Sequence, residues 1–121
     1  MLDGRPALIV EAEFLIALDI QRMLELLGVG QTLFARNAAE ARELRNHWPT
    51  LALAVVALEF DDHEARQLPD DLLAAAIPVI LTTGDVVQHQ AMASGQRQVV
   101  IKPIQEQTMA SAVKRALAIS D

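Results

Sequence analysis

Residues 7–35 read ALIVEAEFLIALDIQRMLELLGVGQTLFA, and their apolar pattern indicates the type of fold. Its first four residues, Ala7–Val10, are all apolar, which is typical of a short strand covered on both faces of a sheet. Apolar residues then recur at helical spacing through Phe14–Leu27, and Gly28 is suited to end that helix. Another largely apolar run, Thr32–Ala35, predicts the next strand. A strand, a helix and a strand in succession indicate two parallel strands joined by a right-handed crossover.

The same alternation continues toward the C-terminus. Further apolar runs predict strands at Leu51–Leu58, Pro78–Leu81 and Gln98–Ile101. Strands separated by helical segments predict an α/β fold, namely one doubly wound, three-layer domain with a parallel sheet over residues 1–121. In such sheets ligands collect beyond the carboxyl ends of the strands, so we expect the functional residues there.

A second helix is predicted after the strand that ends at Ala35. Asn37 and Glu40 resemble an N-terminal capping pair, and we expect Pro49 to stop the helix. The residues expected on its inner face are Ala38, Ala41, Leu44 and Trp48.

The remaining helical segments differ in how clearly the sequence predicts a helix. We expect Leu72–Ala76 to form a short helix with Pro69 near its first turn. Val86–Ala93 begins with β-branched residues and lies between glycines, so we expect it to be short or mobile. Glu106–Ile119 has clear helical periodicity, with Lys114 outward.

Composition limits the class of protein. Of the 121 residues, 52% are hydrophobic and 21% are charged, which argues against a disordered chain. Cysteine is absent, so disulfides and thiolate metal sites are excluded. A net charge of −6 disfavours binding to nucleic acid, and no apolar run is long enough to span a membrane. We expect a cytoplasmic domain that binds neither nucleic acid nor membranes.

Three stretches together resemble the receiver domains of bacterial two-component response regulators. They are Leu8–Glu13, Pro78–Gly84 and Val100–Pro103, and they occur in the order and spacing of that family. The resemblance covers nearly the whole chain. It implies a flavodoxin-like, five-stranded parallel sheet with strand order 2-1-3-4-5.

The resemblance also implies roles for single residues. In receivers, two acids after the first strand and an aspartate ending the third hold Mg²⁺, and that aspartate takes a phosphoryl group from a histidine kinase. A hydroxyl residue after the fourth strand and a lysine before a proline contact the phosphoryl group. Glu11 matches the first acid, Thr83 the hydroxyl residue, and Lys102, which precedes Pro103, the lysine.

Three positions depart from the receiver pattern. The second acid is replaced by Ala12, the phosphoacceptor by Ala57, and an aromatic residue of the fifth strand by Val99. An acyl phosphate requires a carboxylate nucleophile, and Mg²⁺ requires oxygen ligands, whereas alanine offers only a methyl group. We therefore predict a degenerate receiver that is not an enzyme, is not phosphorylated on aspartate, and binds Mg²⁺ weakly or not at all.

Several residues of this predicted pocket have two interpretations. A lysine at the edge of a buried sheet needs an opposite charge, which either Glu11 or Glu59 could supply to Lys102. Thr83 precedes Gly-Asp and also suits an ordinary turn. The sequence leaves open whether the Lys102–Pro103 bond is cis. The three histidines, His47, His63 and His89, stand singly and do not predict a metal site.

The outer face of the first helix is unusually apolar. Phe14, Leu15 and Leu18 cannot share the inner stripe, and neither can Leu26. In receivers this helix docks on the dimerisation domain of the kinase. We expect Phe14, Leu15, Leu18 and Arg22 to contact a histidine kinase or a phosphotransfer protein. The alternative is that the last helix or nearby loops cover Phe14 and Leu26.

Other functions stay open at this stage. The chain could form a homodimer through its fourth helix, fifth strand and fifth helix. It could also be a working phosphorelay receiver that uses an unconventional acid. Asp61 and Asp62 are the candidates, although their position beyond the strand end favours capping of the next segment. A small α/β enzyme or flavin-binding domain is disfavoured, because the acidic residues of the loop Glu11–Phe14 would repel a phosphate.

Overall fold

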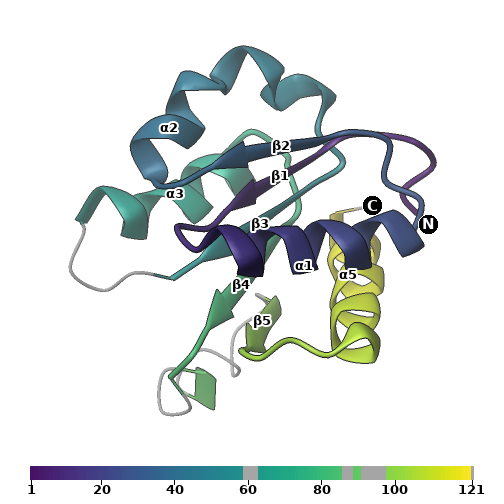
Figure 1. Ribbon diagram of the computed structural model, residues 1–121. Coiled ribbons are helices and arrows are strands. Elements are labelled where there is room, and N and C mark those ends of the chain that lie inside the picture. Colours follow the sequence, from purple (N-terminus) through teal and green to yellow (C-terminus); the bar gives the residue numbers. More distant parts are fainter. Residues whose placement is uncertain (59–62, 86–88, 91–97, 121) are drawn as a thin grey trace.

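The computed structural model of the chain describes residues 1–58, 63–85, 89–90 and 98–120. Its centre is a parallel sheet of five strands in the order β2-β1-β3-β4-β5 (Figure 1). The strands are β1 (Ala7–Val10), β2 (Thr32–Ala35), β3 (Leu53–Ala57), β4 (Val79–Thr83) and β5 (Gln98–Ile101). The predicted fold class and strand order are confirmed.

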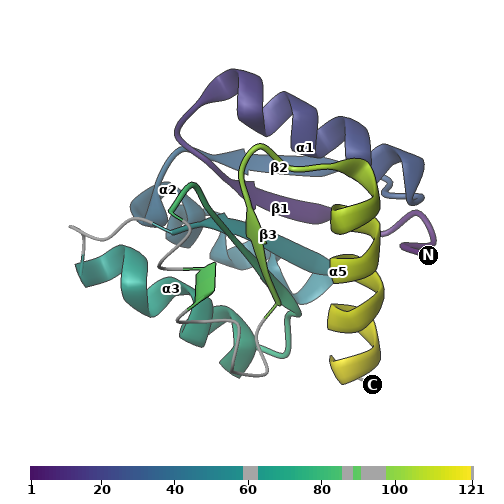
Figure 2. The same cartoon turned by 90° about the horizontal axis from the view of Figure 1, so that it is seen from below.

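Helices cover both faces of the sheet, which gives three layers. They are α1 (Phe14–Leu26), α2 (Ala38–Glu43), a 3₁₀ helix (Arg45–Thr50), α3 (His63–Ala74) and α5 (Glu106–Ser120). Figure 2 shows α1 and α5 on one side of the sheet and α2 and α3 on the other. Most of the segment Val86–Ala93 lies outside the described residues. Within the described part of the chain, no helix is long and apolar enough to cross a membrane.

Each face of the sheet has its own apolar core, because successive strand residues point to opposite sides. Ile9, Val55 and Ile80 pack with the buried faces of α1 and α5. Leu8, Val56 and Leu81 pack with α2, α3 and Trp48 on the other side. This alternation also fixes the direction of the residues that follow each strand.

Two helix predictions are wrong at their ends. The second helix ends at Glu43 rather than before Pro49, which lies inside the 3₁₀ helix. The indole Nε1 of Trp48 donates a hydrogen bond to the carbonyl oxygen of Ala41 at 3.1 Å, so the chain turns back tightly after α2. The predicted cap itself is present, since the side chain of Asn37 accepts from the backbone N–H of Glu40 at 2.9 Å.

The third helix is longer than predicted and contains Pro69 in its interior. A proline there costs about 3 kcal/mol, because it removes a backbone hydrogen bond and crowds the preceding turn. Leu68 and Leu72 lie on one helical face and are fully buried against the sheet. Burying each leucine contributes about 1.5–3 kcal/mol, which offsets the proline.

Smaller differences concern two strands and one glycine. The third strand is shorter than Leu51–Leu58, whereas the fourth runs two residues further than Leu81, to Thr83. Gly28 follows α1 with φ of +92°, a left-handed conformation that glycine adopts without strain. The predicted end of the first helix is therefore confirmed.

The segment before β1 packs closely on the loop between α1 and β2. The backbone N–H of Gly30 donates to the carbonyl of Arg5 at 3.0 Å, and that of Gly4 to the carbonyl of Gly28 at 2.8 Å. A Cβ atom at Gly30 would lie 2.0 Å from the carbonyl oxygen of Gly4. Only glycine allows this approach.

We predict that Gly30→Ala destabilises the protein by about 1–3 kcal/mol, because the backbone must move to relieve the overlap. Urea unfolding followed by circular dichroism measures the loss. Gly84→Ala is the matched control, since a Cβ at Gly84 has nothing within 4 Å; its expected effect is within about 0.5 kcal/mol. Equal stability of the two variants would contradict the close approach.

Candidate functional site

The candidate site lies at the carboxyl edge of the sheet, on the side of α1 and α5. Ile9, Val55, Ile80 and Val100 face this side. The residues two positions further along the chain face it too, because strand side chains alternate. These residues are Glu11, Ala57, Thr82 and Lys102.

An ion pair joins Glu11, which follows β1, to Lys102, which follows β5. The Nζ of Lys102 donates to Oε1 of Glu11 at 2.6 Å, although the two residues are 91 positions apart in the chain. The Glu11 side chain is 3% exposed and that of Lys102 is 23% exposed. Of the two partners that the sequence leaves open for Lys102, the structure uses Glu11. Glu59 lies outside the described residues.

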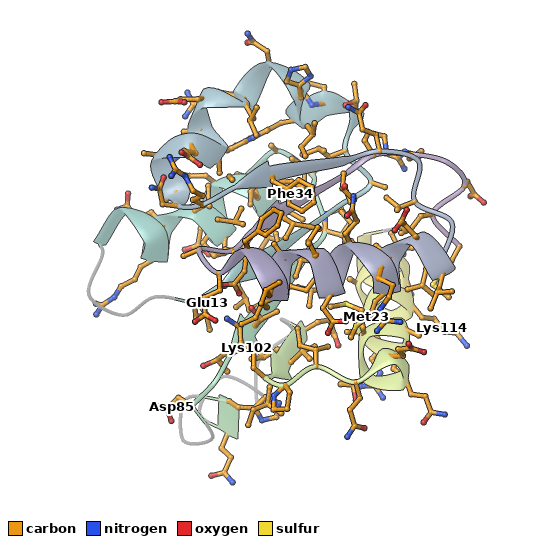
Figure 3. The ribbon with its side chains drawn as sticks, viewed as in Figure 1. Glu13, Met23, Phe34, Asp85, Lys102 and Lys114 are labelled. Carbon is orange, nitrogen blue, oxygen red and sulfur yellow. The ribbon has the colours of Figure 1, made fainter. Side chains whose placement is uncertain are left out.

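The second carboxylate oxygen of Glu11 is also engaged. Its Oε2 accepts a hydrogen bond from the backbone N–H of Glu13, the residue before α1, at 3.0 Å. Figure 3 shows Glu13 and Lys102 at this same edge of the molecule. Both oxygens of the buried carboxylate therefore have a protein partner, and its charge is balanced by the lysine.

Ala12 and Ala57 occupy the two positions at which the receiver pattern has acidic residues. Ala12 is exposed in the loop before α1, and Ala57 is half-buried as the last residue of β3. Ala57 pairs in register with Thr82 of β4. The buried hydroxyl of Thr82 has no hydrogen-bond partner among the described residues, so an unused polar group lies beside the methyl of Ala57.

Thr83 and Lys102 are linked through the backbone. Thr83 is buried and is the last residue of β4 rather than a residue after it, which corrects the predicted strand end. Its Oγ1 accepts from the N–H of Asp85 at 3.1 Å, as the turn interpretation expects. Its carbonyl accepts from the N–H of Lys102 at 2.7 Å. The following Lys102–Pro103 bond is cis, a point that the sequence left open.

The described side chains do not fit a magnesium ion at this edge. Mg²⁺ requires several oxygen ligands and usually one or two carboxylates. The carboxylate of Glu11 forms an ion pair with Lys102, and Ala12 and Ala57 carry no oxygen in their side chains. Within residues 1–58, 63–85, 89–90 and 98–120, no three His, Asp or Glu side chains gather as a metal site. Asp61 and Asp62 lie outside these ranges.

The fifth strand carries Val99 where receivers have an aromatic residue. Val99 is half-buried and packs against the core on the α2 and α3 side. A ring nitrogen of His89 lies 3.1 Å from its carbonyl oxygen. The side chain at this position therefore has no polar or aromatic group to present to the pocket.

The outer face of α1 is exposed, as predicted. Phe14, Leu15 and Leu26 are each more than two-thirds exposed, and Leu18 is 37% exposed. The alternative that α5 or nearby loops cover Phe14 and Leu26 is therefore wrong for the described residues. Helical spacing divides these residues into two stripes, one with Phe14 and Leu18, the other with Leu15 and Leu26.

Arg22 is engaged within the protein. Its guanidinium pairs with Asp19 at 2.9 Å and with Glu106 of α5 at 2.5 Å. The hydrogen bond to Glu106, followed by that to Asp19, raises the pKa of Arg22 above its ordinary value. Arg22 thus ties α1 to the start of α5 at the exposed surface.

A small apolar pocket of about 280 Å³ lies between α1 and the segment after β5. Its lining residues are Ile16, Asp19, Ile20, Lys102, Pro103 and Ile104. The sequence alone did not predict this pocket. The apolar Ile104 next to Pro103 was the available signal, but only the fold brings it to α1.

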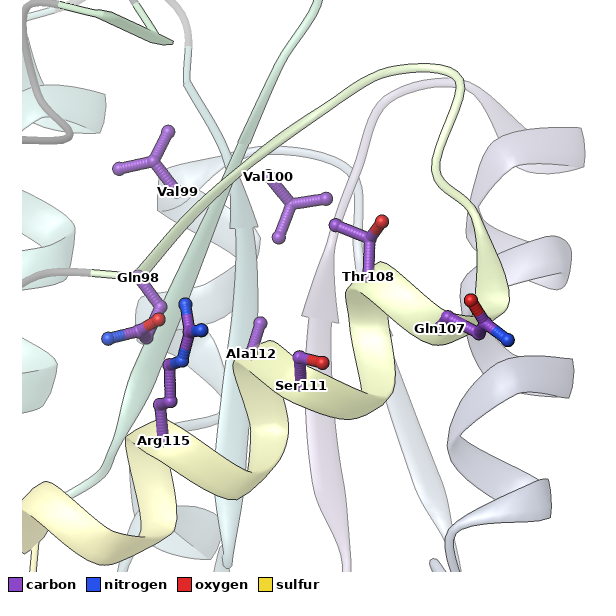
Figure 4. Close-up of a pocket in the computed structure, with 8 residues that line it drawn as sticks. All are labelled: Gln98, Val99, Val100, Gln107, Thr108, Ser111, Ala112 and Arg115. Atoms are coloured by element: carbon purple, nitrogen blue, oxygen red, sulfur yellow. The ribbon is translucent and has the colours of Figure 1, made fainter.

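A second pocket, of about 350 Å³, lies between β5 and α5 (Figure 4). It has Gln98, Val99 and Val100 on the strand side and Thr108, Ser111 and Arg115 among the helix residues. This surface belongs to the predicted dimer face. Most of the predicted fourth helix lies outside the described residues, so that dimer stays a prediction.

Comparison with known proteins supports the receiver fold. No family model matches the chain, and no curated protein matches it. A solved response regulator receiver domain protein from Clostridium thermocellum is 20% identical over 95% of both chains, with a TM-score of 0.75. A receiver protein from Sinorhizobium medicae is 15% identical over the full length of both chains, with a TM-score of 0.76.

The PhyR stress response regulator is 26% identical over 97% of this chain, with a TM-score of 0.78. The match spans 46% of the PhyR chain, so this chain corresponds to about half of that protein. These similarities show that the chain has the fold of response regulator receiver domains.

We predict that Lys102→Met destabilises the protein by about 2–3 kcal/mol, and Glu11→Gln by about 1 kcal/mol. Removing the lysine leaves a buried carboxylate without its counter-charge. The glutamine oxygen of the second variant can still accept from Lys102, and only the hydrogen bond from the N–H of Glu13 is lost. Urea unfolding measures both. Lys114→Met, at an exposed position of α5, is the control with an expected effect within about 0.5 kcal/mol. A Lys102→Met effect as small as that of the control would contradict this account.

Proposed function

We propose that the chain is a receiver-like domain of two-component phosphorelay signalling that is not phosphorylated on aspartate. It would act in the cytoplasm by binding a histidine kinase or a phosphotransfer protein, without an enzymatic step of its own. The observation that carries the proposal is the Glu11–Lys102 ion pair beside the methyl group of Ala57.

The proposal rests first on the missing nucleophile. Phosphoryl transfer to a receiver forms a bond between a carboxylate oxygen and phosphorus, and Ala57 has no oxygen in its side chain. The neighbouring hydroxyl of Thr82 is fully buried, so a phosphodonor in solution does not reach it.

The electrostatics support the same conclusion. Charge on a transferring phosphoryl group is stabilised by cations that are already in place. Here the positive charge of Lys102 is balanced by Glu11 at 2.6 Å. A phosphoryl group entering this edge would have to displace a buried carboxylate from its lysine, and it would face that carboxylate's negative charge.

The exposed residues of α1 supply a surface for a partner. Phe14, Leu15 and Leu18 expose apolar area on α1, and Leu15 lies on the stripe of this helix that leads toward Arg22 and α5. Exposed apolar groups of this kind mark contact surfaces. A chain that occupies a kinase or phosphotransfer protein, yet accepts no phosphoryl group, would lower the phosphoryl flux to genuine receivers.

We predict that incubation with acetyl phosphate and Mg²⁺ leaves the protein unmodified, as measured by intact mass. A labile increase of one phosphoryl group, about 80 Da, would contradict the proposal. It would favour a working receiver with an unconventional acid instead.

The double variant Ala12→Asp/Ala57→Asp is the positive control for this experiment. It returns two carboxylates to a pocket that keeps Thr83 and Lys102, so we expect it to gain the labile adduct. Ala12→Asp/Ala57→Asn has nearly the same shape without a nucleophile, and it should stay unmodified.

We also predict that the protein inhibits phosphoryl transfer from a purified histidine phosphotransfer protein to a genuine receiver. Leu15→Asp should weaken this inhibition at least about tenfold, the effect of losing one central apolar contact. Leu73→Asp, at an exposed leucine of α3, is the matched control. No inhibition by the unmodified protein, or equal inhibition by both variants, would argue against docking through α1.

A further inference from the structure

β2 is a short edge strand of the sheet that has neither a charged residue nor a proline. Edge strands in native proteins are commonly blocked by charged residues, proline or bulges, since their unpaired backbone groups can bind another strand. The four residues Thr32–Ala35 contain neither a charge nor a proline. Phe34 is instead 42% exposed on this strand (Figure 3).

The backbone pairing identifies the open groups of β2. Ala7 donates to the carbonyl of Gln31, and Glu11 donates to the carbonyl of Ala35. Alternate residues of a strand direct their N–H and C=O groups to the same side. Gln31, Leu33 and Ala35 therefore bond toward β1, and the backbone groups of Thr32 and Phe34 point away from the sheet.

One exposed stripe of α1 lies next to the edge strand β2. Gln21 donates a hydrogen bond to Oγ1 of Thr32 at 2.7 Å, so the stripe of α1 that contains Gln21 faces β2. Phe14, Leu18 and Glu25 share that stripe by helical spacing. Phe34 lies on the same side, because it pairs in register with Ile9 of the α1-side core. Figure 2 shows α1 along the β2 side of the sheet.

We propose that a second copy of this chain binds here, with the two β2 strands antiparallel about a two-fold axis at Leu33. Thr32 then lies opposite Phe34 of the second copy, and their outward backbone groups exchange hydrogen bonds. The side chains form an aromatic and β-branched cross-strand pair, which is favourable in sheets. The two α1 helices lie on one face of a continuous sheet, with their apolar stripes toward each other.

Charge complementarity favours a second copy as the occupant. α1 runs back along the sheet before β2 begins, so Glu25 at its C-terminal end lies near the start of β2, whereas Arg36 follows the end of β2. The antiparallel arrangement brings Arg36 of each copy to Glu25 of the other. Arg36 is 78% exposed and pairs with Glu40 through Nε and Nη2, which leaves Nη1 for this contact. This interface is independent of phosphoryl chemistry and does not use Leu15.

Cysteine cross-linking tests the register directly, because the chain has no native cysteine. At the two-fold axis, Leu33 and its copy form a pair without mutual hydrogen bonds, whose close Cα atoms suit a disulfide. We expect Leu33→Cys to give a disulfide-linked dimer under mild oxidation, whereas Ser111→Cys, exposed on α5, stays mostly monomeric. Equal cross-linking of both variants, or stronger cross-linking at Ser111, would overturn the proposal.

Light scattering during gel filtration tests the same interface without cysteine. We expect the apparent mass to rise from 13.2 kDa toward twice that value as concentration increases. Phe34→Asp should remain a monomer, and Leu73→Asp, at a leucine of nearly equal exposure, should dimerise normally. Glu25→Arg, an exposed change, should weaken dimerisation at least about tenfold through repulsion from Arg36. A wild-type mass that stays at 13.2 kDa at all concentrations would refute the dimer.

Discussion

The partly buried ion pair between Glu11 and Lys102 sets the charge balance of the candidate site. A carboxylate with a 3% exposed side chain needs a counter-charge, and the lysine at 2.6 Å supplies it. The same contact joins the loop after β1 to the segment after β5. The two charged groups that remain from the receiver pattern thus pair with each other, and the charge of Lys102 is balanced within the protein.

This pair also shapes the surface around it. Lys102 and the following Pro103 and Ile104 are held against α1, where they border an apolar pocket. The exposed pair of Arg22 with Glu106 makes a second connection between α1 and the start of α5. The docking surface that we propose would exist without phosphorylation, because these contacts hold its parts together in the unmodified protein.

The outer surface of α1 has two stripes that suit different contacts. Leu15 lies on the stripe that leads toward Arg22 and α5, where we propose the signalling partner. Phe14 and Leu18 lie on the stripe toward β2, where we propose the second copy. Both stripes begin in the first turn of α1, so a dimer and a docked partner would compete for space at that end of the helix.

Apolar periodicity in the sequence predicted a parallel sheet with alternating strands and helices, because that period depends only on local residue spacing, whereas the strand order followed from the resemblance to receiver domains. The sequence by itself also determined that Ala12 and Ala57 remove carboxylates from the site. It misjudged Pro49 and Pro69, since burial of Trp48, Leu68 and Leu72 outweighed local helix preferences. The folded chain alone reveals that Lys102 pairs with Glu11 and that the hydroxyl of Thr82 has no partner among the described residues beside Ala57. It also reveals that Phe34 lies on the same side of the sheet as α1. These contacts join residues far apart in the chain, and no local pattern encodes them.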